Sequence, residues 1–159
     1  MANFNSNVKS AIIAAIRAAL KKDFESFQQA SQQTRQSGND EQSQPDGKYD
    51  TQSTEANYLA DGQARQAEEI AQAAACFETM EARDFKTYHP IDLGALVEME
   101  INQQSQWFFL APASGGLEIQ VKDQEITLIT PDSPLGKQII GQYQGEQISS
   151  PVAKILSIL

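Results

Sequence analysis

Acidic side chains gather in the middle of the chain, where Asp40, Glu41 and Asp46 lie close together in sequence. Residues 38–81 carry ten acidic and two basic side chains, a net charge of −8, whereas residues 1–37 carry two acidic and five basic ones, a net charge of +3. Clustered carboxylates attract cations and basic surfaces. The middle of the chain therefore suits a partner with a basic channel, or a metal ion. A solvated polar loop is the alternative for any one of these carboxylates taken alone.

Other residue types that carry chemistry are scarce. His89 and Cys76 are the only histidine and the only cysteine. The chain therefore lacks the further histidine and cysteine residues that a zinc site or an internal disulfide needs, and it has no recognisable catalytic triad. His89 precedes Pro90 and is interpreted as a loop residue. Cys76 lies in the alanine-rich stretch AQAAACFETM, which predicts a small core residue of a helix. We expect the chain to have no enzyme activity of its own.

The net charge of −9 and the isoelectric point near 4.5 limit the possible partners. Contacts to nucleic-acid phosphates need clustered lysine and arginine, so autonomous DNA binding is not expected. The apolar run Ala11–Leu20 is interrupted by Arg17 and is too short to span a bilayer. No signal peptide is recognised at the start. We expect a cytoplasmic protein with no membrane contact.

Residues 6–37 and 51–82 each repeat apolar side chains at spacings of three and four, the pattern of an amphipathic helix. The positions that follow this period are Val8, Ile12, Ile16, Ala19 or Leu20, Phe24 or Asp23, Phe27 and Ala30, then Ala56, Leu59, Gln63, Ala67, Ile70, Ala74, Phe77 and Met80. Residues 38–50 have loop composition. The pattern predicts a long antiparallel hairpin, a coiled coil with arms of roughly 45–50 Å at 1.5 Å per residue and an acidic tip at 38–50.

Strand patterns prevail after Pro90. We predict strands at 96–101, 106–110, 117–121 and 125–129, and a strand or helix at 152–159. Trp107, Phe108 and Phe109 place aromatic rings on both faces of one strand, so one set must be covered by another element or face away from the core. An aromatic pocket that also includes Tyr143 is the alternative to simple core packing. The fold class is therefore α+β, with a hairpin at 1–83 and a small antiparallel sheet domain at 84–159.

The segment 129–146 combines a strand, a capped turn, a short helix and a return strand. Asp132 or Ser133 can cap the helix, with Pro134 at its first position. Gly141 can end the helix in a left-handed conformation. The helix would bury one apolar face, formed by Leu135, Ile139 and Ile140.

Residues 133–146, SPLGKQIIGQYQGE, resemble the signature of the C-terminal domain of Gre-type (GreA/GreB-like) bacterial transcription elongation factors. Four elements match at fixed spacing: Ser133-Pro134, Gly136-Lys137, Ile140-Gly141 and Gly145-Glu146. The stretch IDLGALVEMEI is similar to the segment that opens that domain, and KYDTQSTEANYLADGQARQAEEI takes the place of the ascending hairpin helix. The chain looks like a divergent branch of the family.

The resemblance implies a helical hairpin followed by a sheet domain similar to the FKBP fold. It implies bacterial RNA polymerase as the partner, bound at its secondary channel. The residues that the resemblance offers for contact with the polymerase are Ser133, Pro134, Leu135, Gly136 and Lys137, together with Tyr49, the nearest match to a tyrosine that follows the acidic tip in the family.

In that family, two carboxylates at the hairpin tip help to hold a catalytic magnesium ion of the polymerase. Aligned on Tyr49 without gaps, this chain has Gln42 and Pro45 at the two positions, and neither can serve. A shift of one or two residues would bring Asp40 or Glu41 with Asp46 into place, and magnesium needs only one or two carboxylates besides its waters.

The resemblance therefore leaves alternatives open. In the first, the tip shares the polymerase's magnesium, and the polymerase itself cleaves the backtracked transcript while the factor brings no cofactor of its own. In the second, the chain occupies the channel without cleavage, inhibiting the polymerase or competing with Gre factors. A third alternative, from another class, is an FKBP-like peptidyl-prolyl isomerase or chaperone.

Overall fold

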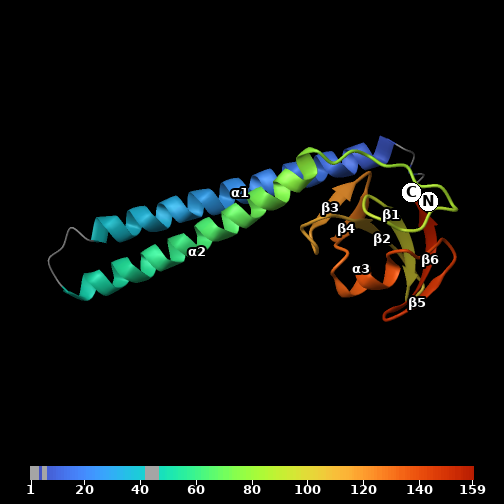
Figure 1. Cartoon of the computed structure of the whole chain (residues 1–159). Helices are drawn as coiled ribbons and strands as arrows, with labels where there is room; N and C mark the ends of the chain where they lie inside the picture. Colours follow the sequence, from blue (N-terminus) through green and yellow to red (C-terminus); the bar gives the residue numbers. More distant parts are fainter. Residues whose placement is uncertain (1–3, 5–6, 42–46) are drawn as a thin grey trace. The chain divides into compact units, whose positions relative to one another are not determined.

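The computed structural model describes residues 4, 7–41 and 47–159, and the side chains of 37–57 lie outside the described part. Two long helices precede a six-stranded sheet, and one short helix lies between the fourth and fifth strands in the chain. The chain therefore has the predicted α+β architecture (Figure 1). The elements in order are α1 (Asn7–Glu41), α2 (Gly47–Glu78), β1 (Leu96–Ile101), β2 (Gln104–Leu110), β3 (Glu118–Val121), β4 (Gln124–Ile129), α3 (Pro134–Ile139), β5 (Gln147–Ser149) and β6 (Val152–Ile158). Within the described ranges, no helix has the length and apolar character needed to cross a membrane.

Contacts between Cα atoms divide the chain into two compact units. The sheet unit comprises residues 1–17 and 76–159, and the hairpin unit comprises residues 18–75. Both α1 and α2 therefore pass from one unit to the other. The predicted boundary between residues 83 and 84 differs from this division because the apolar start of α1 clusters with the sheet. That residues 1–83 and 84–159 are separate domains stays a prediction.

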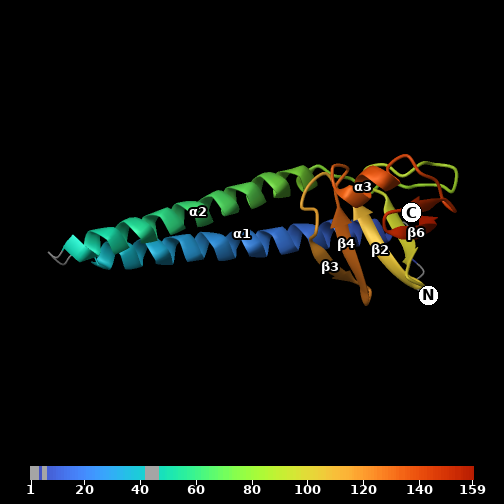
Figure 2. The ribbon, with the colours of Figure 1, turned by 90° about the horizontal axis from the view of Figure 1, so that it is seen from below.

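In the hairpin unit, α1 and α2 run antiparallel and side by side (Figures 1 and 2). Leu20 and Ala67 are buried in the seam as predicted. Leu59 was predicted there too, but it is 58% exposed, and its neighbour Ala60 is fully buried instead. One residue turns a helix by about 100°, because 3.6 residues make a turn. Periodicity alone therefore placed the seam of α2 one residue too early at this point.

The sheet has the strand order β3-β4-β2-β1-β6-β5. Strand β1 pairs antiparallel with β2 and β6, and the pairs β3–β4 and β5–β6 are also antiparallel. The prediction of a wholly antiparallel sheet is wrong for one pair, because β2 and β4 run parallel. Strand β3 runs opposite to β2, and the chain then turns back so that β4 lies between them. Because β4 is antiparallel to β3, it runs in the same direction as β2.

Both faces of the sheet are buried. Residues paired across neighbouring strands share a face, and the pair Val97–Phe108 belongs to a core that includes Ile139 of α3. The pair Trp107–Ile126 lies on the opposite face, with Phe109. This arrangement separates Phe108 from Trp107 and Phe109, so the three rings are packed in the core on two faces, and the alternative of one shared aromatic pocket is not formed.

The second aromatic face is covered by another part of the chain, which is one of the two predicted outcomes. The ring of Phe4 meets Trp107 edge-on, with 4.6 Å between the ring centroids. The beginning of α1 belongs to the same unit as the sheet. Its apolar side chains are buried at Val8, Ile12, Ile13 and Ile16. The N-terminal segment is thus part of the sheet unit's core.

Helix α2 ends at Glu78, earlier than the predicted residue 82. Arg17 of α1 accounts for this end. Its Nε and Nη2 donate to the carbonyl oxygen of Phe77 over 2.8 and 2.5 Å, and Nη2 donates to that of Glu78 over 2.9 Å. The last carbonyls of a helix have no partner within the helix, and here a guanidinium group supplies one. Cys76, predicted to be a core residue, is exposed.

Candidate functional site

The short helix α3 begins at a turn built by Ser133. This residue has the extended backbone of an N-cap, with φ −65° and ψ 154°. Its Oγ accepts a hydrogen bond from the backbone N–H of Gly136 over 3.0 Å and donates one to the carbonyl oxygen of Thr130 over 2.7 Å. Pro134 follows at the first helical position. Of the two predicted caps, Asp132 and Ser133, the structure uses Ser133.

Gly136 is the residue that lets α3 sit against the end of β4. A Cβ atom at this position would lie 1.9 Å from the carbonyl oxygen of Thr130 and 2.9 Å from Oγ of Ser133. No residue with a side chain fits without moving the backbone. The Ser-Pro-Xaa-Gly part of the motif therefore has a local structural cause: a hydroxyl cap and a close approach of two backbone segments.

The C-terminal end of α3 is joined to the segment before β1. Gly141 has a φ of +79°, as its predicted helix-ending role requires. Its N–H donates to the carbonyl oxygen of Ile91 over 2.8 Å, and the N–H of Ile91 donates to that of Gln142 over 2.8 Å. These bonds bring IDLG and SPLGKQIIGQ together, the two stretches that carry the sequence resemblance in this unit.

Four exposed side chains lie on these joined segments and on α3, and we call them the α3 surface: Leu93, Lys137, Ile140 and Tyr143. The exposed fractions of Leu93, Ile140 and Tyr143 are 39, 40 and 45%, and Lys137 is exposed as well. Ile140 was predicted to face the core with Ile139, but it caps the helix and turns outward. Exposed large apolar side chains and an exposed lysine on joined segments are suited to contact with another protein.

The predicted contact residues differ in what they expose. Pro134 and Lys137 are exposed, Ser133 and Leu135 are half-buried, and Gly136 is buried. Leu135 packs against the core. Gly136 shapes the turn and has no surface of its own to offer. Contact with a partner by any of these residues stays a prediction.

A glutamine fastens α3 to the far edge of the sheet. The side-chain amide of Gln138 donates to the carbonyl oxygen of Ser150, and its Oε1 accepts from the N–H of Ser150 over 3.1 Å. Ser150 lies in the turn between β5 and β6. The helix is thus held at its start by Thr130, at its middle by Ser150 and at its end by Ile91.

The second candidate site is the acidic tip. Asp46 and the side chains of Asp40, Glu41 and Tyr49 lie outside the described residues, so the proposed magnesium ligands stay a prediction. The backbone corrects the predicted loop at 38–50, because α1 continues to Glu41 and α2 begins at Gly47. Among the side chains that the structure describes, no three metal-binding groups are clustered.

A buried lysine near the start of α1 had no signal in the sequence. The Nζ of Lys9 donates to the carbonyl oxygen of Arg83 and lies 4.4 Å from the centroid of the Phe85 ring. Burial lowers the pKa of Lys9 to about 8, although the nearby charge of Asp84 acts to raise it. Arg83 also pairs with Asp92 over 2.8 Å, and this hydrogen bond lowers the pKa of the Asp92 carboxyl. The cluster fastens α1 to the segment that follows α2.

His89 is a loop residue, as predicted. Its Nδ1 accepts a hydrogen bond from the backbone N–H of Lys86 over 3.1 Å. The backbone N–H of His89 donates to the carbonyl oxygen of Lys86 over 2.8 Å. The imidazole therefore supports a local turn.

The comparisons with known proteins found similar solved structures only. No protein-family model matches the chain, and no curated protein matches it. The crystal structure of GreA factor homolog 1 (Gfh1) of Thermus thermophilus is similar over 92% of this chain and 94% of that one, with 16% identity and a TM-score of 0.36. Thermus aquaticus Gfh1 is similar over 91% of this chain and 94% of that one, with 17% identity and a TM-score of 0.34. Likeness at this level identifies neither a family nor an activity.

Proposed function

We propose that this chain is a Gre-like regulator of transcription elongation, which binds bacterial RNA polymerase at the secondary channel. One observation carries the proposal. The residues through which the sequence resembles Gre factors, from Ser133 to Gly141, build a turn and helix that leave Lys137 and Ile140 exposed. A motif that served only to fold the sheet unit would not need an exposed lysine and an exposed isoleucine.

In this proposal the α3 surface binds the polymerase and the hairpin enters the channel. Leu93, Ile140 and Tyr143 supply apolar area, and Lys137 supplies a positive charge within a chain of net charge −9. The factor acts in the cytoplasm, without binding DNA by itself. It has no enzyme activity of its own.

The hairpin tip decides between the two forms of the proposal. If Asp40, Glu41 and Asp46 reach the polymerase's magnesium ion, the factor stimulates cleavage of backtracked transcripts. Gln42 and Pro45 at the aligned positions favour the alternative, a non-cleaving channel binder that inhibits the polymerase or competes with Gre factors.

Binding and cleavage are tested separately. Immobilised chain should capture core RNA polymerase, and a Gre factor in solution should displace it. Lys137→Glu should weaken the capture at least tenfold without changing the melting temperature. Lys122→Glu is the matched control, because Lys122 lies in the turn before β4 while α3 follows the other end of that strand. Equal capture by both variants would move the interface away from α3.

Stalled, backtracked elongation complexes then report on the tip. Replacing Asp40, Glu41 and Asp46 by Asn, Gln and Asn should abolish any stimulated cleavage and preserve capture. Wild-type chain that binds but stimulates no cleavage would assign it to the non-cleaving form. An isomerase is the less favoured alternative, because Phe108 lies on the face of the sheet opposite to Trp107 and Phe109.

A further inference from the structure

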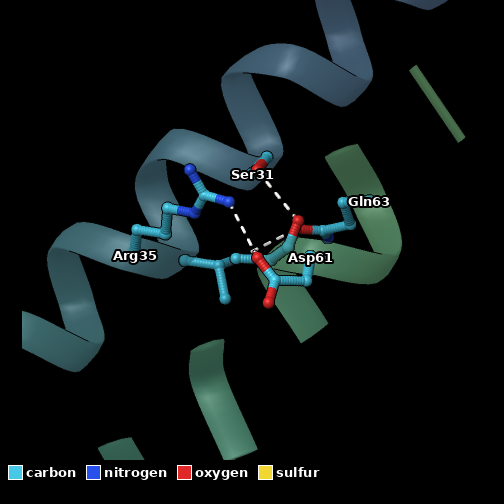
Figure 3. A network of polar contacts seen from close by, with 6 residues as sticks. Ser31, Arg35, Asp61 and Gln63 are labelled. Atoms are coloured by element: carbon cyan, nitrogen blue, oxygen red, sulfur yellow. Dashed lines mark hydrogen bonds and ion pairs between the residues drawn. The ribbon is translucent and has the colours of Figure 1, made fainter. Parts of the chain in front are cut away.

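Two stretches in the middle of the hairpin unit lie side by side, residues 26–36 of α1 and residues 58–67 of α2. Arg35 of the first stretch pairs with Asp61 of the second over 2.8 Å, and Oγ of Ser31 donates to a carbonyl oxygen of α2 over 3.0 Å (Figure 3). We call the two stretches together the neutral zone.

The neutral zone has few charged side chains. Three of its 21 residues are charged, and two of these, Arg35 and Asp61, neutralise each other, which leaves Arg65. In the adjoining stretches 18–25 and 68–75, six of 16 residues are charged. Contacts to nucleic-acid phosphates need clustered lysine and arginine, so this zone does not suit a nucleic acid. Depletion of charge is instead typical of the part of a protein surface that another protein buries.

Glutamine takes many of the exposed positions of the zone. Neighbouring residues of a helix point about 100° apart, so the pairs Gln28-Gln29 and Gln32-Gln33 cover a broad side of α1 rather than one edge. The exposed glutamines are Gln28, Gln29, Gln32, Gln33, Gln36 and Gln66. A partner that matches this uncharged surface would surround the zone.

One face of α2 in the neutral zone departs from the pattern of a solvated helix. Tyr58 and Leu59 are 72 and 58% exposed, and Tyr58 is the most exposed aromatic side chain among those described. Gly62 follows them at the spacing of surface neighbours. Glycine is the poorest helix former apart from proline, yet no described atom lies within 4 Å of the place of its missing Cβ. We call these three residues the Gly62 face.

Packing within the described chain gives no reason for this glycine, whereas contact with another protein does. The bare backbone at Gly62 lets a ridge of a partner approach the helix closely. Tyr58 and Leu59 lie beside this notch and supply apolar contact area, and tyrosine is enriched among the residues that contribute most to binding in protein interfaces. A residue that breaks a local preference without an internal gain is expected at a functional site.

The Gly62 face is too small to hold a partner by itself. One aromatic and one aliphatic side chain bury together on the order of 300 Å², whereas each partner in a stable complex buries about 800 Å². A second copy of this chain that bound only through this face would dissociate. The face therefore fits a partner that the chain also binds elsewhere, and the α3 surface offers that second contact.

We propose that the Gly62 face contacts the wall of the polymerase channel, and that the neutral zone is the part of the hairpin that this wall encloses. The inference rests on the proposed function and adds to it a binding surface on the sides of the hairpin. Enclosure by protein removes water from the enclosed surface, which costs far more free energy for unpaired charges than for amides that find hydrogen-bond partners. The charged stretches 18–25 and 68–75 stay in solvent.

Capture of core RNA polymerase by the immobilised full chain measures the contribution of the face. Tyr58→Gln removes the ring, keeps the zone uncharged and should weaken capture at least tenfold. Gly62→Gln fills the notch with a better helix former. It should therefore raise the melting temperature of the helices and weaken capture at least fivefold. A residue with a merely structural role would not combine a more stable chain with weaker binding.

Two matched variants and two crosslinks serve as controls. Tyr88→Gln removes a tyrosine that is 65% exposed outside the hairpin, and Ala75→Gln adds glutamine at an exposed position of α2 outside the neutral zone. Both variants should bind as the wild type does. A photoreactive benzoylphenylalanine at Gln33, which is exposed on α1 in the zone, should crosslink to bound polymerase, and one at Lys22 should not.

The outcomes separate this inference from the proposed function. If Tyr58→Gln and Gly62→Gln bind as tightly as the wild type while Lys137→Glu binds weakly, the Gly62 face is no contact and only the inference is overturned. No capture by the wild type would overturn the proposed function, and the inference with it. Dimers of the free chain that Tyr58→Gln abolishes would assign the face to a second copy and overturn the channel wall as its partner.

Discussion

Replacing Gly136 by alanine is the sharpest test of how α3 is held. The added Cβ would lie 1.9 Å from the carbonyl oxygen of Thr130, where real Cβ atoms come no closer than 3.0 Å. The oxygen must therefore move by about 1.1 Å, the difference between these values. That oxygen accepts hydrogen bonds from N and Oγ of Ser133, over 3.0 and 2.7 Å, so the move disrupts the cap as well.

The expected cost follows from these two effects. Forcing a methyl group into a filled site costs about 1–3 kcal/mol, and each lost hydrogen bond costs about 1 kcal/mol. We expect Gly136→Ala to lower the free energy of unfolding by about 3–5 kcal/mol. For a chain of this length, that is a drop of roughly 10 °C in melting temperature.

Trp107 gives a local assay, because it is the only tryptophan and lies buried in the sheet unit. Its fluorescence during thermal or urea unfolding should show the loss of stability in Gly136→Ala, while far-UV circular dichroism follows the long helices. Gly62→Ala makes the same substitution at an open position and is the control. A Gly136→Ala variant within about 0.5 kcal/mol of wild type would refute the close approach of α3 to Thr130.

Three other predictions follow from single contacts. Gly62→Ala should raise the stability of the hairpin unit by up to about 1 kcal/mol, seen as a higher helix melting temperature. Ser133→Ala should cost about 1 kcal/mol through loss of the N-cap, seen in Trp107 fluorescence, and Asp132→Ala should not. The lowered pKa of Lys9 means that the folded state resists its protonation, so stability should rise between about pH 8 and 10.5 and level off below pH 8. Lys9→Met should lack this rise in urea titrations, and parallel pH profiles would contradict the burial of Lys9.

Local patterns in the sequence predicted most of the elements. The strand from Leu96 to Ile101 is confirmed at both ends, and the other long strands are confirmed within a few residues, because β-branched runs and turn residues mark them. The cap at Ser133 and the left-handed Gly141 are also confirmed, since each depends on the chemistry of one residue. The return strand predicted within residues 129–146 is wrong in position, because β5 begins only at Gln147 and its three residues are too few for a pattern.

Features that depend on tertiary contacts could not be predicted in this way. The parallel pairing of β2 with β4 depends on the order of the strands, which no local pattern encodes. Lys9 is buried because the carbonyl oxygen of Arg83 and the ring of Phe85 receive it, and both come from a distant part of the chain. The outward turn of Ile140 follows from the bond between Gly141 and Ile91.

The candidate site was predicted in part. The sequence correctly located the turn and helix at 133–141, but Leu93 and Tyr143 join the α3 surface only through backbone pairing of separate segments. The contacts of Ser31 with Ala60 and of Arg35 with Asp61 were missed, because Ser31 and Arg35 look like ordinary polar residues of an exposed helix face. Only their alignment with Ala60 and Asp61 gives them a role.

Capture of core RNA polymerase, with and without a competing Gre factor, tests the central claim most directly. The account predicts that the chain binds the polymerase, that a Gre factor displaces it, and that Lys137→Glu weakens binding while Lys122→Glu does not. Absence of binding, or binding that a Gre factor leaves unchanged, would contradict a role at the secondary channel.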